Sequence, residues 1–221
     1  MEPELILFKR FDDIALANAL TDVLDANGIT YTMEENAQSF DPGFRSNELT
    51  RQYSVKIDAG DFERVTKLLN ENELENVNNA DKEHYLYSFT DAELIEVLAK
   101  ADEWSPFDYQ LARKILTERG VTINEKMLAD LKKERLEELK TPEPPQNGWI
   151  IVGYIFAIMG GALGIFIGWY LVTFKKTLPD GERVYAYNEN DRQQGKWILY
   201  IAIAVTVIIV VYRISQVFTG N

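Results

Sequence analysis

The stretch from 148 to 174 constrains this chain most, because it carries no charged residue across 27 positions. A helix needs about 20 mostly apolar residues to cross the hydrocarbon core of a bilayer. Trp149 lies near one end of the stretch and Trp169 near the other, as expected of aromatic side chains at the two membrane interfaces. Two lysines follow directly. The sequence therefore predicts a transmembrane helix over 148–174.

A second apolar stretch follows. Trp197 to Tyr212 comprises 16 uncharged residues, rich in valine and isoleucine, between Lys196 and Arg213. A helix here reaches about Phe218 if Arg213 extends its charged end to the lipid headgroups. Residues 148–221 are thus predicted to form a two-helix transmembrane hairpin, with spans at 148–174 and 197–218 and a polar loop at 175–196.

Small residues recur every four positions in the first predicted span. Small side chains let two helix backbones approach closely in lipid. Both the second helix of the same chain and a second molecule in a homodimer fit this pattern. The predicted packing residues are Gly153, Ala157 and Gly161 in one row and Gly160, Gly164 and Gly168 in the other.

Charge gives conflicting signals about orientation. The predicted loop holds five basic residues, which favours a cytoplasmic loop. That placement would require export of the long acidic region before residue 148, whose N-terminus lacks the features of a secretory signal. We therefore expect a two-span protein of the cell inner membrane with both termini in the cytoplasm, the lipid bilayer being its first partner.

The region before residue 148 is strongly acidic. It contains 17 Lys and Arg against 31 Asp and Glu, a net charge of 17 − 31 = −14, which disfavours binding to nucleic-acid phosphates. The chain has no cysteine, which excludes disulfides, thiolate nucleophiles and Cys-ligated metals. Its one histidine, His84, excludes a His-rich metal site. No nucleic acid, metal or cofactor is expected.

The first 75 residues alternate strand and helix patterns. The predicted elements are a strand at Leu5–Phe11, a helix from an Asp12 or Asp13 cap to Asn27-Gly28, strands at Ile29–Glu34 and Gln52–Ile57, and a helix at Asp61–Asn70. Residues 76–88 form either an acidic linker or part of a fourth strand at His84–Phe89, which would complete a small ferredoxin-like split βαβ sandwich of the α+β class. Without it, the sheet has three strands.

The segments LILFKRFDDIALANALTDVLDANGITYTME and QYSVKIDAGDFERVTKLL resemble a small bacterial family of signal-transducing proteins. Ala15, Ala19, Leu24 and the pair Gly28-Ile29 occupy places similar to those of the family's core and cap residues. The resemblance covers about residues 4–72. It implies a regulatory role in sensing a ligand or a protein, and transfers no catalytic residue.

Residues 89–140 are predicted to be helical. Thr90 to Glu93 reads as a capping box, and Ser105-Pro106 as the start of a second helix. Residues 141–147, rich in proline, form a stiff linker to the membrane part. This remainder of the chain resembles uncharacterised Bacteroidetes-type membrane proteins with two helices.

The loop FDPGFR is the best candidate for a ligand- or partner-binding site. It combines two aromatic side chains, an arginine and a tight turn, and loops on rigid scaffolds often carry function. The candidate residues are Phe40, Asp41, Phe44 and Arg45.

No phosphate-binding loop and no paired acid-base residues stand out, so we expect no enzyme. We predict a membrane-anchored sensor or adaptor that binds a small ligand or a protein through its N-terminal domain, with a protein partner or a homo-oligomer. The alternative is a structural accessory subunit of a larger membrane complex. A transporter component is disfavoured, since the predicted spans hold almost no charge.

Overall fold

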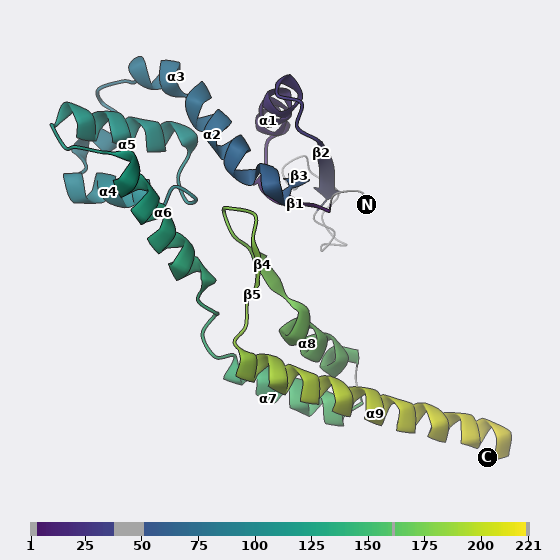
Figure 1. The fold of residues 1–221 in the computed structure, drawn as a ribbon. Helices are drawn as coiled ribbons and strands as arrows, with labels where there is room; N and C mark the ends of the chain where they lie inside the picture. The colour runs from purple at the N-terminus through teal and green to yellow at the C-terminus, as the bar shows by residue number, and fades with distance from the viewer. Residues whose placement is uncertain (1–3, 38–50, 161, 220–221) are drawn as a thin grey trace. The chain divides into compact units, whose positions relative to one another are not determined.

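The computed structural model describes residues 4–37, 51–160 and 162–219, and Figure 1 shows a mostly helical chain with small sheets. Two compact units are present. Met1–Leu139 with Thr177–Glu182 form the N-terminal unit, and Lys140–Lys176 with Arg183–Asn221 form the C-terminal unit.

A three-stranded antiparallel sheet opens the N-terminal unit. Its strands are β1 (Leu5–Phe11), β2 (Tyr31–Ala37) and β3 (Arg51–Asp58), in the order β1-β3-β2. Helix α1 (Ile14–Ala26) connects the two outer strands. The carboxylate of Asp13 caps α1 by accepting a hydrogen bond from the Ala15 N–H at 2.8 Å. Gly28, with φ of 64°, ends the helix in the left-handed region that favours glycine.

The sheet packs one face against helices. After a short 3-10 turn at Ala59–Asp61, α2 (Phe62–Asn72) joins α1 on this face. Leu24, Val55, Ile57 and Val65 are fully buried there. These are the positions where the strand and helix periodicities place apolar side chains, so local pattern and packing agree.

The fourth strand that the sequence left open at His84–Phe89 does not form. Instead, Tyr85–Ser88 forms a 3-10 turn after the short helix α3 (Leu74–Asn78), and no fourth strand joins this sheet within the described ranges. The turn buries Leu86 completely in a helical core. The guanidinium of Arg119 donates to the Tyr87 carbonyl at 2.9 Å and to the Phe89 carbonyl at 2.7 Å. These two carbonyls would accept hydrogen bonds from a neighbouring strand in a β-sheet, and here they accept them from Arg119.

Two helices supply most of the buried residues of that second core, and a third packs against it through partly buried side chains. The three helices are, in this order, α4 (Asp91–Ala99), α5 (Pro106–Glu118) and α6 (Glu125–Lys140). The predicted caps are present: Thr90 and Glu93 form a capping box, and the Ser105 hydroxyl accepts from the Asp108 N–H at 3.0 Å. Leu94, Leu111 and Leu116 are fully buried. The predicted ferredoxin-like α+β class is therefore wrong, because the described chain is mostly helical and the sheet of this unit has only three strands among the described residues.

The first predicted span is also wrong, because residues 148–174 form two helices. These are α7 (Asn147–Ile158) and α8 (Ala162–Thr173), each of 12 residues. At 1.5 Å per residue each is about 18 Å long, shorter than a hydrocarbon core of about 30 Å. Gly160 adopts φ of 73° between them, a conformation that ends α7 and that glycine reaches without strain.

One helix, α9 (Glu189–Thr219), is the only described helix long and apolar enough to cross a membrane. The predicted two-helix transmembrane hairpin is thus corrected to one candidate span plus the short pair α7 and α8. A small hairpin of β4 (Lys175–Thr177) and β5 (Arg183–Tyr185) connects α8 to α9.

The three helices of the C-terminal unit lie side by side (Figure 1). An added Cβ on Gly153 would meet Ile198, and one on Gly160 would meet Ile209, so α7 runs parallel to α9. Gly164 faces Ala157, and Gly168 faces Leu199, so α8 runs antiparallel to both. The chain therefore enters α7 and leaves α8 at the same end of the unit, beside the start of α9.

Candidate functional site

The end of the C-terminal unit where α7 and α9 begin gathers its polar side chains. Asp191 lies in the first turn of α9 and is fully buried. Its Oδ2 accepts a hydrogen bond from the Gln146 backbone N–H at 3.0 Å and one from the Asn188 side-chain amide at 3.1 Å. In return, the Asp191 N–H donates to Asn188 Oδ1 at 2.9 Å. One carboxylate thus joins the starts of two helices.

The second oxygen of Asp191, Oδ1, is buried and has no hydrogen-bond partner in the described structure. The neighbouring Arg192 Nε is buried and unpartnered as well. Unsatisfied buried polar atoms are uncommon in folded proteins and cost free energy. Two of them on consecutive residues distinguish this end of the unit from the apolar remainder of α9.

Two cations at this end of the unit lie over the aromatic ring of Tyr185. The Arg192 guanidinium carbon lies 3.4 Å from the centre of the Tyr185 ring, and Lys175 Nζ lies 4.8 Å from the same ring. Tyr187, two residues on, makes an edge-to-face contact with Tyr170 at 6.0 Å between ring centres. Burial raises the pKa of Tyr187 to about 12.

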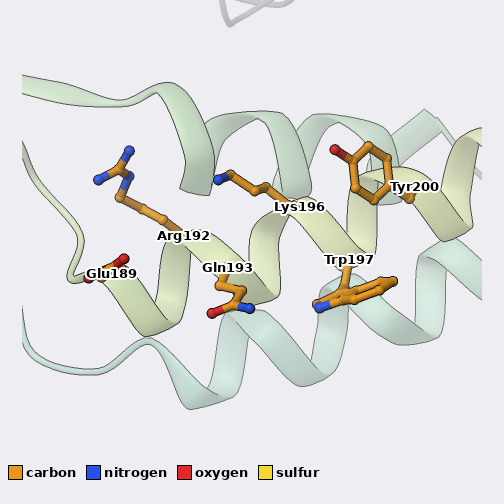
Figure 2. Close-up of a pocket in the computed structure, with 6 residues that line it drawn as sticks. All are labelled: Glu189, Arg192, Gln193, Lys196, Trp197 and Tyr200. Carbon is orange, nitrogen blue, oxygen red and sulfur yellow. The ribbon is translucent and has the colours of Figure 1, made fainter.

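A groove of about 350 Å³ opens along the first three turns of α9 (Figure 2). Figure 2 shows Arg192, Lys196 and Tyr200 along one edge of the groove, and Gln193 and Trp197 along the other edge. Glu189 lies at the outer end of the groove. The groove therefore offers two cations, one carboxylate, one amide and two aromatic rings, which suit an anionic group attached to an apolar body.

The sequence-predicted binding residues Phe40, Asp41, Phe44 and Arg45 lie outside the described residues. That prediction stays a prediction.

The predicted packing residues lie inside the C-terminal unit, with the exception of Gly161, which is not described. Gly153, Ala157, Gly164 and Gly168 are buried against neighbouring helices of the same chain. Gly160 forms the turn between α7 and α8. The small residues thus have an intrachain role, which the sequence left open beside a homodimer contact.

A salt-bridge cluster occupies the N-terminal unit. The Arg135 side chain is 11% exposed and makes paired hydrogen bonds to Asp102 at 3.0 and 2.9 Å, with Glu138 at 2.8 Å and a further contact to Glu103. These bonds raise the pKa of Arg135. The cluster joins α6 to the turn that follows α4, and the Arg135 guanidinium is engaged by three carboxylates, so we assign it a structural role.

His84 lies in a third polar cluster. Its Nδ1 accepts from the Leu86 N–H at 3.4 Å, and its Nε2 lies 3.8 Å from Asp108. The Tyr85 hydroxyl and the Ser105 hydroxyl both donate to Asp108, at 2.8 and 2.6 Å. Because Ser105 bonds to the carboxylate and not to the imidazole, the arrangement lacks the base-activated hydroxyl of nucleophilic catalysis. Within the described ranges, no group of three or more potential ligands is placed to hold a metal.

Asp191 and Asn188 were not singled out from the sequence, and for Tyr185 the sequence indicated a place at the headgroups but no contact with Arg192. A signal for the first two was present, because Asn188 and Asp191 have the spacing of a helix cap and its reciprocal partner. The contact of Asp191 with Gln146 had no sequence signal, since 45 residues separate the two. The stacking of Arg192 on Tyr185 likewise depends on the turn between β5 and α9.

Comparison with family models, with curated proteins and with solved structures finds no match to this chain. The resemblances described from the sequence accordingly stay predictions.

Proposed function

We propose that the chain is a membrane-anchored sensor or adaptor, in which α9 crosses the bilayer and the α7–α8 hairpin enters it without crossing. The observation that carries the anchor is the distribution of exposed apolar side chains. Of 25 large hydrophobic side chains exposed in the described part, 20 lie at Trp149 or beyond. Exposed apolar surface on this scale marks contact with lipid or with other proteins.

The geometry of the hairpin supports entry from one side. The Glu143 N–H donates to the Ala186 carbonyl at 2.7 Å, and Lys176 Nζ donates to the Thr141 carbonyl at 2.8 Å. The segment leading into α7 and the β4–β5 hairpin after α8 are therefore held together at one end. The opposite end, at Ile158 and Met159, is apolar and exposed, as expected of a hairpin tip in hydrocarbon.

A single span is compatible with both charge signals about orientation. The five basic residues of the predicted loop lie at the end where the chain enters the unit. In the sequence after Lys196, Arg213 is the one basic residue. The bias of basic residues toward the cytoplasm supports a cytoplasmic location for that end and for residues 1–140. With a single span in the inner membrane, the C-terminus lies on the opposite side, which replaces the sequence-based expectation of a cytoplasmic C-terminus.

Cysteine labelling tests the topology, because the chain contains no cysteine of its own. We expect Asn221→Cys to react with a membrane-impermeant maleimide in intact spheroplasts. Glu182→Cys should react only after the membrane is permeabilised. Met159→Cys, at the hairpin tip, should stay unlabelled until the bilayer is dissolved in detergent.

Labelling of Glu182→Cys in intact spheroplasts would contradict this topology, because the β4–β5 hairpin would then lie outside. Gln146→Cys provides the matched control at the entrance to α7, and it should follow Glu182→Cys.

The sensor or adaptor role is proposed for the N-terminal unit. Its support is the resemblance of residues 4–72 to a signal-transducing family and the long connection between β2 and β3. We expect the full chain, captured from native membranes in mild detergent, to bring a partner that Phe44→Ala and Arg45→Ala lose. Lys67→Ala, an exposed position on α2, is the control and should retain the partner.

A structural subunit of a larger membrane complex is the second candidate, favoured by the same exposed apolar faces of α7, α8 and α9. Capture of a membrane partner that the Phe44 and Arg45 variants keep would favour this role over the adaptor.

A further inference from the structure

The groove on α9 combines charged, amide and aromatic side chains. A helix that only anchors a protein in a bilayer needs apolar side chains. Arg192 and Lys196 are separated by four residues, so their side chains share one face of the helix. Lys196 is exposed, and no ion pair to it is found among the residues the structure describes. Arg192 is held in place by its stack on Tyr185 at 3.4 Å. One cation is thus preorganised, and the other is available.

The same helix face continues into apolar surface. Beyond Lys196, the positions reached by steps of three or four residues are Tyr200, Ile203 and Val207, which are 60%, 45% and 54% exposed. Trp197 borders the change from polar to apolar side chains and is 54% exposed. Aromatic residues at such a boundary mark the level of the lipid headgroups.

We propose that this groove binds the headgroup of an anionic phospholipid, with the phosphodiester between Arg192 and Lys196 and an acyl chain along Tyr200, Ile203 and Val207. Gln193 and Glu189 supply an amide and a carboxylate for headgroup hydroxyls, as in phosphatidylglycerol. The inference rests on the proposed function, because it requires α9 to lie in a bilayer. Apolar contact between α9 and acyl chains would not distinguish lipids by their headgroups. The groove would give the anchor a preference among headgroups.

A phosphate attached to acyl chains fits the groove better than free phosphate for two reasons. The cations lie at the polar end of a continuous apolar face, so one ligand can contact both. Glu189 also opposes a small, highly charged anion at the outer end of the groove, whereas a headgroup hydroxyl can donate to this carboxylate.

Titration of the purified full chain with lipids, read by native mass spectrometry, tests the assignment. We expect phosphatidylglycerol to bind more tightly than phosphatidylcholine with the same acyl chains. Lys196→Gln should weaken phosphatidylglycerol binding about five-fold, which is the effect of removing one cation near a headgroup. The double variant Arg192→Gln/Lys196→Gln should lose the preference, and Lys196→Arg should keep it.

Arg213→Gln is the matched control, because it removes the same charge from the same helix outside the groove. Equal binding of the two lipids, or an equal loss in Arg213→Gln, would overturn the inference. Inorganic phosphate that competes as well as phosphatidylglycerol would assign the site to free phosphate instead. Flotation with vesicles of phosphatidylcholine alone distinguishes failure of the proposed membrane anchor from failure of the proposed lipid site. If the protein does not float, the anchor is contradicted. If it floats but shows no headgroup preference, only the lipid site is contradicted.

Discussion

Replacing Gly164 with alanine is expected to destabilise the C-terminal unit by about 1–3 kcal/mol, the usual cost of overpacking a filled interior. A Cβ at this position would lie 2.6 Å from the Ala157 backbone nitrogen and 2.7 Å from the Ala157 Cα. Both are backbone atoms, so α7 and α8 would have to separate. The same change at Gly168 would place a Cβ 2.8 Å from the Gly195 carbonyl oxygen and separate α8 from α9.

Alanine also favours the helix over glycine by about 1 kcal/mol. A loss of stability on replacing glycine with alanine would therefore show that a close contact outweighs this gain. Gly148 in α7 has no atom within 4 Å of an added Cβ, and Gly148→Ala should leave stability unchanged or slightly higher. Thermal unfolding of the full chain in detergent measures all three variants. If Gly164→Ala is as stable as Gly148→Ala, the close contact of α7 with α8 does not exist in the folded protein.

The second large effect is expected from Asp191→Ala, at about 2–4 kcal/mol. The substitution removes the acceptor for the Gln146 N–H and the reciprocal bond with Asn188, so the starts of both α7 and α9 lose a partner. Loss of a helix cap costs about 1 kcal/mol, and a buried donor left without a partner adds about 1–3 kcal/mol.

Asp191→Asn retains an oxygen acceptor of similar shape and should cost less than Asp191→Ala. Glu189→Ala, an exposed residue in the same turn of α9, controls for loss of a carboxylate near the helix start. Chemical unfolding in mixed micelles measures the difference. Equal stability of Asp191→Ala and Glu189→Ala would show that the buried carboxylate does not join the two helices.

Much of the N-terminal unit could be predicted from local pattern. The strand of Leu5–Phe11, the cap at Asp13 and the stop at Gly28 each follow from neighbouring residues, and the structure contains all three. The segment His84–Phe89 could not, because its weak alternation is compatible with a strand. Arg119, about 30 residues away, binds the carbonyls of the turn that forms there instead, and Leu86 fills a helical core.

For the C-terminal unit, the sequence by itself determined that 148–174 and 197–212 are apolar and that cations gather between them, since both are properties of composition. Only the tertiary structure decided that the first stretch turns back at Gly160. Glycine pairs are compatible with a continuous span in lipid, so hydropathy cannot distinguish the two conformations. The turn is compatible with packing because Gly153, Gly164 and Gly168 let three helices approach closely. That packing brings Asp191 to Gln146 and places both ends of the hairpin beside the start of α9.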